Sequence, residues 1–202
     1  MISLEMMKEI DWEVAMKTFG NNHSTLIGLI VSWWIMGDPD TRTALDSGPS
    51  FGHRGRNEGG GGACDAVLLQ DHAGKGIVEV EGSRYERTIE KIGKYFEAEY
   101  DHLKTLEFGI LLAYSIGPEG RGDERRIKSP PKHEILSRVK EVTSRYHDKA
   151  IAVVILDKEF ERITEGLRSK SEYYCCTPQK IDGYLVKEGK IVDECTFAAG
   201  GV

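Results

Sequence analysis

The stretch that most constrains the fold covers residues 59–87 and reads as a β-hairpin that carries three carboxylates. Its first strand, CDAVLLQ, contains Asp65, and its second strand, GIVEVEG, contains Glu79 and Glu81. The turn between them falls around Asp71–Lys75. Because side chains alternate across a strand, Glu79 and Glu81 share one face, while the valines between them point to the other.

The register of the hairpin decides how Asp65 meets the other two acids. If the turn centres on His72, Asp65 faces Glu79; if it centres on Ala73, Asp65 faces Glu81. Both registers leave all three carboxylates on one side of the sheet. Converging carboxylates beside a glycine run are typical of a site for a hard divalent cation.

The surroundings of Asp65 favour such a site over an idle charge. Its neighbours are Ala63, Cys64, Ala66 and Val67, an apolar setting in which a carboxylate without a partner is costly. The competing interpretation is a solvent-facing row of charges, because the pattern E-x-E is common on strands.

Composition restricts the class of protein. At 202 residues, the chain is long enough for one domain with a sizeable core. A formal net charge of −6 argues against a non-specific nucleic-acid coat protein, although a local basic groove remains compatible with it. The apolar run 26–36 is too short for the ~20 residues that span a bilayer, so we expect a buried helix and no membrane partner.

Cysteine usage bears on the compartment and on zinc. The four cysteines form no C-x-x-C pair, and no signal-peptide pattern is present, so we expect a cytoplasmic protein. Cys175, Cys176 and Cys195 with His133 form a weak candidate for zinc, and buried thiols on strands are the favoured interpretation.

Periodicity and punctuation predict an α/β fold, a mixed sheet covered by helices, in one domain. The segment 37–62 is rich in Gly, Pro, Asp and Ser and is expected to be irregular, with a short strand near 50–53. A hairpin with its turn at Glu188–Gly189 closes the chain. The remaining expected elements are helices over 3–19, 24–36, 83–103, 132–146 and 159–168, and buried strands over 106–116 and 150–156.

Residues 24–115 resemble the core of the PD-(D/E)XK (restriction-endonuclease-like) nuclease superfamily. That core has a helix, a hairpin with Asp on one strand and E-x-K on the next, then a helix and a strand. The segment 62–65, GACD, is similar to its G-x-x-D, and 77–81, IVEVE, is similar to its apolar-E-x-K strand. The resemblance implies a restriction-endonuclease-like mixed sheet, with 117–202 as a C-terminal extension of the same domain.

The resemblance further implies a metal-dependent nuclease that hydrolyses phosphodiester bonds in DNA as an endonuclease or exonuclease. Asp65 and Glu79 would hold Mg²⁺ (or Mn²⁺), and Glu81 would complete the catalytic set by assisting the attacking water. A homodimer is expected by analogy with restriction enzymes. A metal-binding hydrolase of small phosphorylated ligands is a weaker alternative.

Glu81 departs from the family pattern because it stands where the motif has Lys. A Glu cannot stabilise developing negative charge as a Lys does. Two metal ions, or a cation from the next helix, would then supply the missing charge; that helix carries Arg84, Arg87, Lys91 and Lys94. The alternative is a catalytically inactive module that binds nucleic acid or mediates assembly.

Further candidates flank the hairpin. Glu58 is a candidate third metal ligand, and a solvated loop carboxylate is the competing interpretation. Arginines and a lysine on both sides are candidates for binding nucleic-acid phosphates through charge-assisted hydrogen bonds. This set consists of Arg54, Arg56, Arg84, Arg87 and Lys91.

Overall fold

The structure, a computed structural model, describes residues 2–12, 23–46, 63–97, 105–115, 129–163 and 173–199. Within these ranges seven strands form one mixed sheet, and their order in the sheet follows the chain. The strands are β1 (Arg42–Asp46), β2 (Ala66–Gln70), β3 (Ala73–Glu81), β4 (Phe108–Tyr114), β5 (Ala150–Ile163), β6 (Tyr173–Lys187) and β7 (Lys190–Ala199). The described helices are α1 (Leu4–Met7), α3 (His23–Met36), α4 (Tyr85–Phe96) and α5 (Lys132–Ser144).

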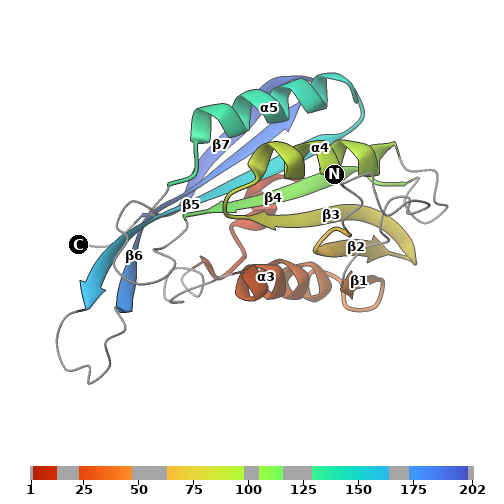
Figure 1. The fold of residues 1–202 in the computed structure, drawn as a ribbon. Coiled ribbons are helices and arrows are strands. Elements are labelled where there is room, and N and C mark those ends of the chain that lie inside the picture. Colours follow the sequence, from red (N-terminus) through yellow and green to blue (C-terminus); the bar gives the residue numbers. More distant parts are fainter. Residues whose placement is uncertain are drawn as a thin grey trace, which may run out of the picture.

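Strand direction divides the sheet into three parts. β1, β2 and β3 are antiparallel, β3, β4 and β5 are parallel, and β5, β6 and β7 are antiparallel again. α4 and α5 cover one face of the sheet and α3 covers the other (Figure 1). The prediction of a mixed sheet covered by helices is therefore confirmed.

The alternation of side chains along β2 and β3 builds two cores. Leu68 and Val78 pack toward α3 with Trp33 and Trp34, whose indole N–H groups donate to backbone oxygens. Ile77, which precedes Val78 on β3, points to the opposite face and packs toward α4 and α5. β4 is buried on both faces, which explains its run of apolar residues without polar alternation.

The β2–β3 hairpin takes the first of the two expected registers. Its two-residue turn, Asp71–His72, has φ angles of 52° and 64°, as a type I′ turn requires. A bulge between Leu68 and Leu69 then shifts the pairing, so that Ala66 lies opposite Val78. Because β2 and β3 are antiparallel, the residue before Ala66, which is Asp65, lies level with the residue after Val78, which is Glu79.

Three predicted elements need correction. The segment expected to be irregular contains β1, a short edge strand whose Ala44 packs on the α3 side; the expected strand near 50–53 lies outside the described residues. The predicted short helix over 159–168 is wrong over 159–163, because β5 continues there in pairing with β6. Residues 164–168 lie outside the described residues.

The predicted helix over 3–19 is confirmed over Leu4–Met7 but is interrupted over 8–11. α1 ends at Met7, and the next backbone hydrogen bonds join residues three apart, such as Lys8 N–H to Glu5 O. Hydrogen bonds between residues three apart place Leu4, Met7 and Ile10 on the same buried side of the chain. This spacing of apolar residues is also found on one face of an α-helix, which explains the longer predicted helix. Residues 13–19 lie outside the described residues.

The closing hairpin agrees with its prediction: Glu188 and Gly189 both have positive φ and join β6 to β7. The helices predicted over 24–36 and 132–146 are confirmed as α3 and α5. In the described part of the chain, no helix combines the length and apolar character that crossing a bilayer requires.

Candidate functional site

Glu79 lies at the centre of the candidate site, in β3 on the face that α4 covers. Its side chain is only 3% exposed, and the ammonium of Lys91 on α4 lies 2.6 Å from Oε2. Lys91 also donates to the carbonyl oxygen of Ala63 at 3.1 Å, so it bridges the segment before β2 and the carboxylate of β3. The other oxygen of Glu79, Oε1, is buried and accepts no hydrogen bond.

Asp65 reaches the same region from the residue before β2. Its Oδ2 accepts the backbone N–H of Val80 at 2.7 Å, which fixes the carboxylate beside β3. Nε2 of His23, the first residue of α3, lies 3.4 Å from the same oxygen. Asp65 thus lies between the start of α3 and β3, where its charge acts on Glu79.

Burial determines the charge of Glu79. It raises the pKa of this carboxyl to about 8, even though Lys91 acts in the opposite direction. The charges of Asp65 and Glu81 raise the pKa of Glu79 further. Burial and these charges favour the protonated form of Glu79, whereas the ammonium of Lys91 favours the ionised form.

Glu81 has a different environment, because its carboxylate accepts hydrogen bonds from the turn that leads into α4 and from Thr88 of α4. Oε1 accepts the backbone N–H groups of Gly82 and Ser83 at 2.9 and 2.8 Å, and Oε2 accepts the hydroxyl of Thr88 at 3.0 Å. Burial raises the pKa of Glu81, but the hydrogen bonds from Arg84, Ser83, Thr88 and Gly82 outweigh burial and lower it.

The helix predicted to begin at residue 83 begins at Tyr85 as α4, and the side chain of its N-cap residue, Arg84, makes no capping hydrogen bond. Glu81 accepts the N–H groups of Gly82 and Ser83, just before the helix, and the E-x-E pattern alone does not reveal this role. Glu81 as a water-assisting residue stays a prediction.

The carboxylates of Asp65 and Glu79 are suited to bind a divalent cation. Glu79 Oε1 is a buried oxygen without a hydrogen-bond partner, and the charge of Asp65 lies close enough to raise the pKa of Glu79. Two carboxylates with an unused oxygen are the hard ligands that Mg²⁺ prefers. Among the described residues, however, no three His, Cys, Asp or Glu side chains form a metal-ligand group.

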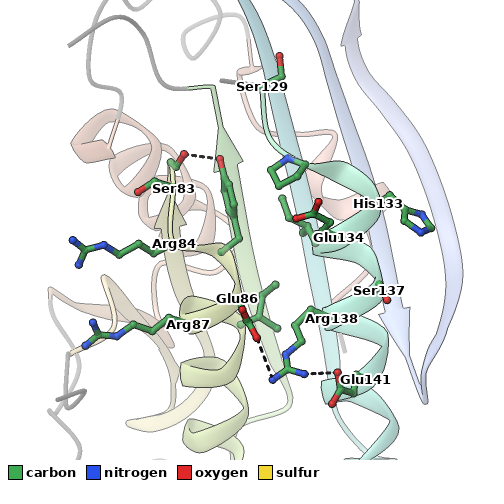
Figure 2. Close-up of a pocket in the computed structure, with 15 residues that line it drawn as sticks. Ser83, Arg84, Glu86, Arg87, Ser129, His133, Glu134, Ser137, Arg138 and Glu141 are labelled. Atoms are coloured by element: carbon green, nitrogen blue, oxygen red, sulfur yellow. Dashed lines mark hydrogen bonds and ion pairs between the residues drawn. The ribbon is translucent and has the colours of Figure 1, made fainter. Parts of the chain in front are cut away.

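Arg84 and Arg87 are exposed on α4 and, with residues of α5, line a cavity of about 920 Å³. Figure 2 shows both arginines extending away from α5, whereas Glu86 points toward Arg138. Arg54, Arg56 and Glu58 lie outside the described residues.

The pattern-based reasoning missed His23, because the six histidines are scattered along the chain. Its position at the start of a helix preceding the hairpin was the available signal. The favoured interpretation of the three cysteines, buried thiols on strands, is met in part by Cys195, which lies on β7 and is half-buried. The side chains of Cys175 and Cys176 lie outside the described part of the structure.

Comparison with known proteins adds no identity: no protein-family model, curated protein or solved structure matches this chain.

Proposed function

We propose that this protein is a metal-dependent nuclease that hydrolyses phosphodiester bonds in DNA. The observation that carries the proposal is the convergence of Asp65, Glu79 and Lys91 at the start of β2, in β3 and on α4. Two acids beside a lysine are the groups that phosphodiester hydrolysis with a divalent cation requires.

The order of elements supports the same proposal. A helix (α3), a hairpin (β2–β3), a helix (α4) and a strand parallel to β3 (β4) follow one another as in the PD-(D/E)XK core that residues 24–115 resemble. Asp65 lies at the start of the first hairpin strand and Glu79 in the second, where that family carries its two acids.

Lys91 would supply the positive charge that the motif lysine supplies in the PD-(D/E)XK family. Glu81 occupies the motif position but is held by the N–H groups at the start of α4. Lys91 places its ammonium 2.6 Å from Glu79, so a cation lies beside the acids although it comes from a helix rather than from β3. In the proposed reaction, Lys91 orients the attacking water and stabilises negative charge on the phosphate.

Asp65 and Glu79 would hold Mg²⁺ or Mn²⁺, with water and substrate oxygens completing the coordination. The cation would supply Lewis-acid polarisation of the phosphate. The backbone N–H of Val80 orients Asp65, and the burial of Glu79 excludes bulk water from its unused oxygen.

Cleavage of plasmid DNA tests the proposal. We expect Mg²⁺-dependent nicking by the natural protein and a loss on the order of 10²-fold or more in Glu79→Gln and Lys91→Met. The matched control is Lys190→Gln, an exposed lysine on β7, which should keep full activity. Equal cleavage by all four proteins would reject the assignment.

A catalytically inactive, nucleic-acid-binding module is the second candidate. The observation that favours it is that Lys91 already pairs with Glu79, and among the described residues no third acid joins Asp65 and Glu79 in a metal-ligand group. Binding of DNA without any cleavage in Mg²⁺ or Mn²⁺ would support this candidate.

A further inference from the structure

Helix α4 divides its charged residues between two flanks. Glu86 and Glu90 face α5, where Arg138 contacts both, with its Nη2 2.9 Å from Glu90 Oε1. Nη2 of Arg145, the residue that follows α5, also lies 2.9 Å from Oε1 of Glu90. The acidic flank is thus neutralised within the protein.

The opposite flank is basic and is not neutralised in this way. Arg84, Arg87, Lys91 and Lys94 recur at spacings of three and four residues, which place them on one stripe of a helix. Lys91 pairs with Glu79, whereas no carboxylate of the described residues lies within ion-pair distance of Arg84, Arg87 or Lys94. These three side chains are exposed. We call Arg84, Arg87 and Lys94 the basic flank.

We propose that the basic flank binds the phosphates of one strand of duplex DNA and guides that strand to Glu79. This inference rests on the proposed function, because Lys91 on the same stripe belongs to the proposed active site. From Arg84 to Lys94 the helix rises about 15 Å, which spans roughly four steps of a B-form strand at ~3.4 Å each.

The surroundings of the basic flank favour duplex over single-stranded DNA. Proteins that hold single strands combine cations with aromatic rings on which bases stack. The aromatic residues of α4 are not available for this role: Tyr85 and Tyr95 are buried, and Phe96 packs on Tyr146. Cations without exposed rings are suited to phosphate contacts, which position a duplex without reading its bases.

The acidic flank lies on the side of α4 that faces α5, where Arg138 and Arg145 already neutralise it. Figure 2 shows Arg84 and Arg87 extending to the other side of α4, away from α5. The cations that carry this inference are therefore open to a phosphate backbone on the outer side of α4.

The test measures the salt dependence of binding to a 20-base-pair duplex in EDTA, where no cleavage occurs. Each phosphate contact contributes about 0.9 to the slope of log K against log salt for B-form DNA. The double variant Arg87→Gln/Lys94→Gln should lower the slope by about 1.8. The control Lys187→Gln/Lys190→Gln removes the same charge from the β6–β7 turn and should leave the slope unchanged.

Equal slope changes in both double variants, no change in either, or tighter binding of a 20-base single strand would overturn this inference. A thermal melt of each variant verifies that these substitutions leave the fold intact. Because the assay contains no divalent cation, its result is independent of cleavage. A protein that binds as expected but never cuts would overturn the nuclease proposal and leave the basic flank in place.

Discussion

The carboxyl of Glu79 couples stability to pH. Its pKa is raised to about 8 in the folded protein from an ordinary value of 4.5, mainly because the group is buried. A proton binds more tightly to the folded state, so the favourable contribution is complete below about pH 4.5 and is lost as the pH rises to about 8.

The first prediction follows from that coupling. Glu79→Gln should remove the decline in unfolding free energy between about pH 4.5 and 8, which amounts to at most about 5 kcal/mol for a shift of this size. Urea titrations of both proteins across this window provide the measurement. Parallel pH profiles for the two proteins would contradict the assigned burial of this acid.

Glu81 leads to a second prediction, because capping and catalysis have different consequences. If the carboxylate only caps α4, Glu81→Ala should lower the unfolding free energy by about 1–2 kcal/mol and leave cleavage within a few-fold. A direct role in proton transfer would instead cost roughly 10²-fold or more in rate, with Thr88→Val as the control that removes one capping bond.

At the scale of elements, two glycines make opposite demands on the chain. Gly76 of β3 lies against the ring of Phe108 on β4, so that a Cβ at this position has no room. Gly28 of α3 is exposed and has nothing within 4 Å of where a Cβ would lie.

The third prediction contrasts these two positions. Gly76→Ala should destabilise the protein by about 1–3 kcal/mol through overpacking between β3 and β4. Gly28→Ala should stabilise it by up to about 1 kcal/mol, because Ala is the better helix former. Thermal melts of both variants measure this contrast, and a Gly76→Ala variant as stable as the natural protein would refute the observed pairing of β3 with β4.

The sequence predicted those elements whose pattern of apolar residues matches the surface that they bury in the structure. α3, α5, β4 and the β2–β3 hairpin are such elements, because a buried surface selects each pattern directly. The extension of β5 to Ile163 could not be found in this way, since it depends on pairing with β6, which is distant in sequence. The short edge strand β1 likewise depends on its partner β2.

The candidate site was predictable only in part. Alternation placed Glu79 and Glu81 on one face, but the capping role of Glu81 depends on how α4 starts after β3. Lys91 was one of four cations considered for the missing charge, and only the packing of α4 on the sheet distinguishes it.

At the scale of the whole molecule, the parallel strands β3, β4 and β5 hold α4 and α5 over one face, and α4 in turn holds Lys91 against Glu79. The site thus depends on the sheet and on α4 together. The homodimer inferred by analogy stays a prediction, and sedimentation equilibrium would test it.

Metal binding provides a fourth prediction at this scale. A divalent cation stabilises the ionised form of Glu79, so binding should release a proton and strengthen as the pH rises toward about 8. Mn²⁺ should therefore raise the melting temperature more at pH 8 than at pH 6. Asp65→Asn should abolish this shift, whereas Asp193→Asn, an exposed acid on β7, should retain it.

The most direct measurement is anomalous diffraction from a crystal soaked in Mn²⁺. We predict a peak between Asp65 and Glu79, with Oε1 of Glu79 as one ligand at roughly 2.0–2.6 Å. A soaked crystal with Mn²⁺ bound only elsewhere, and with Glu79 still paired to Lys91 alone, would contradict the metal site on which the proposed nuclease depends.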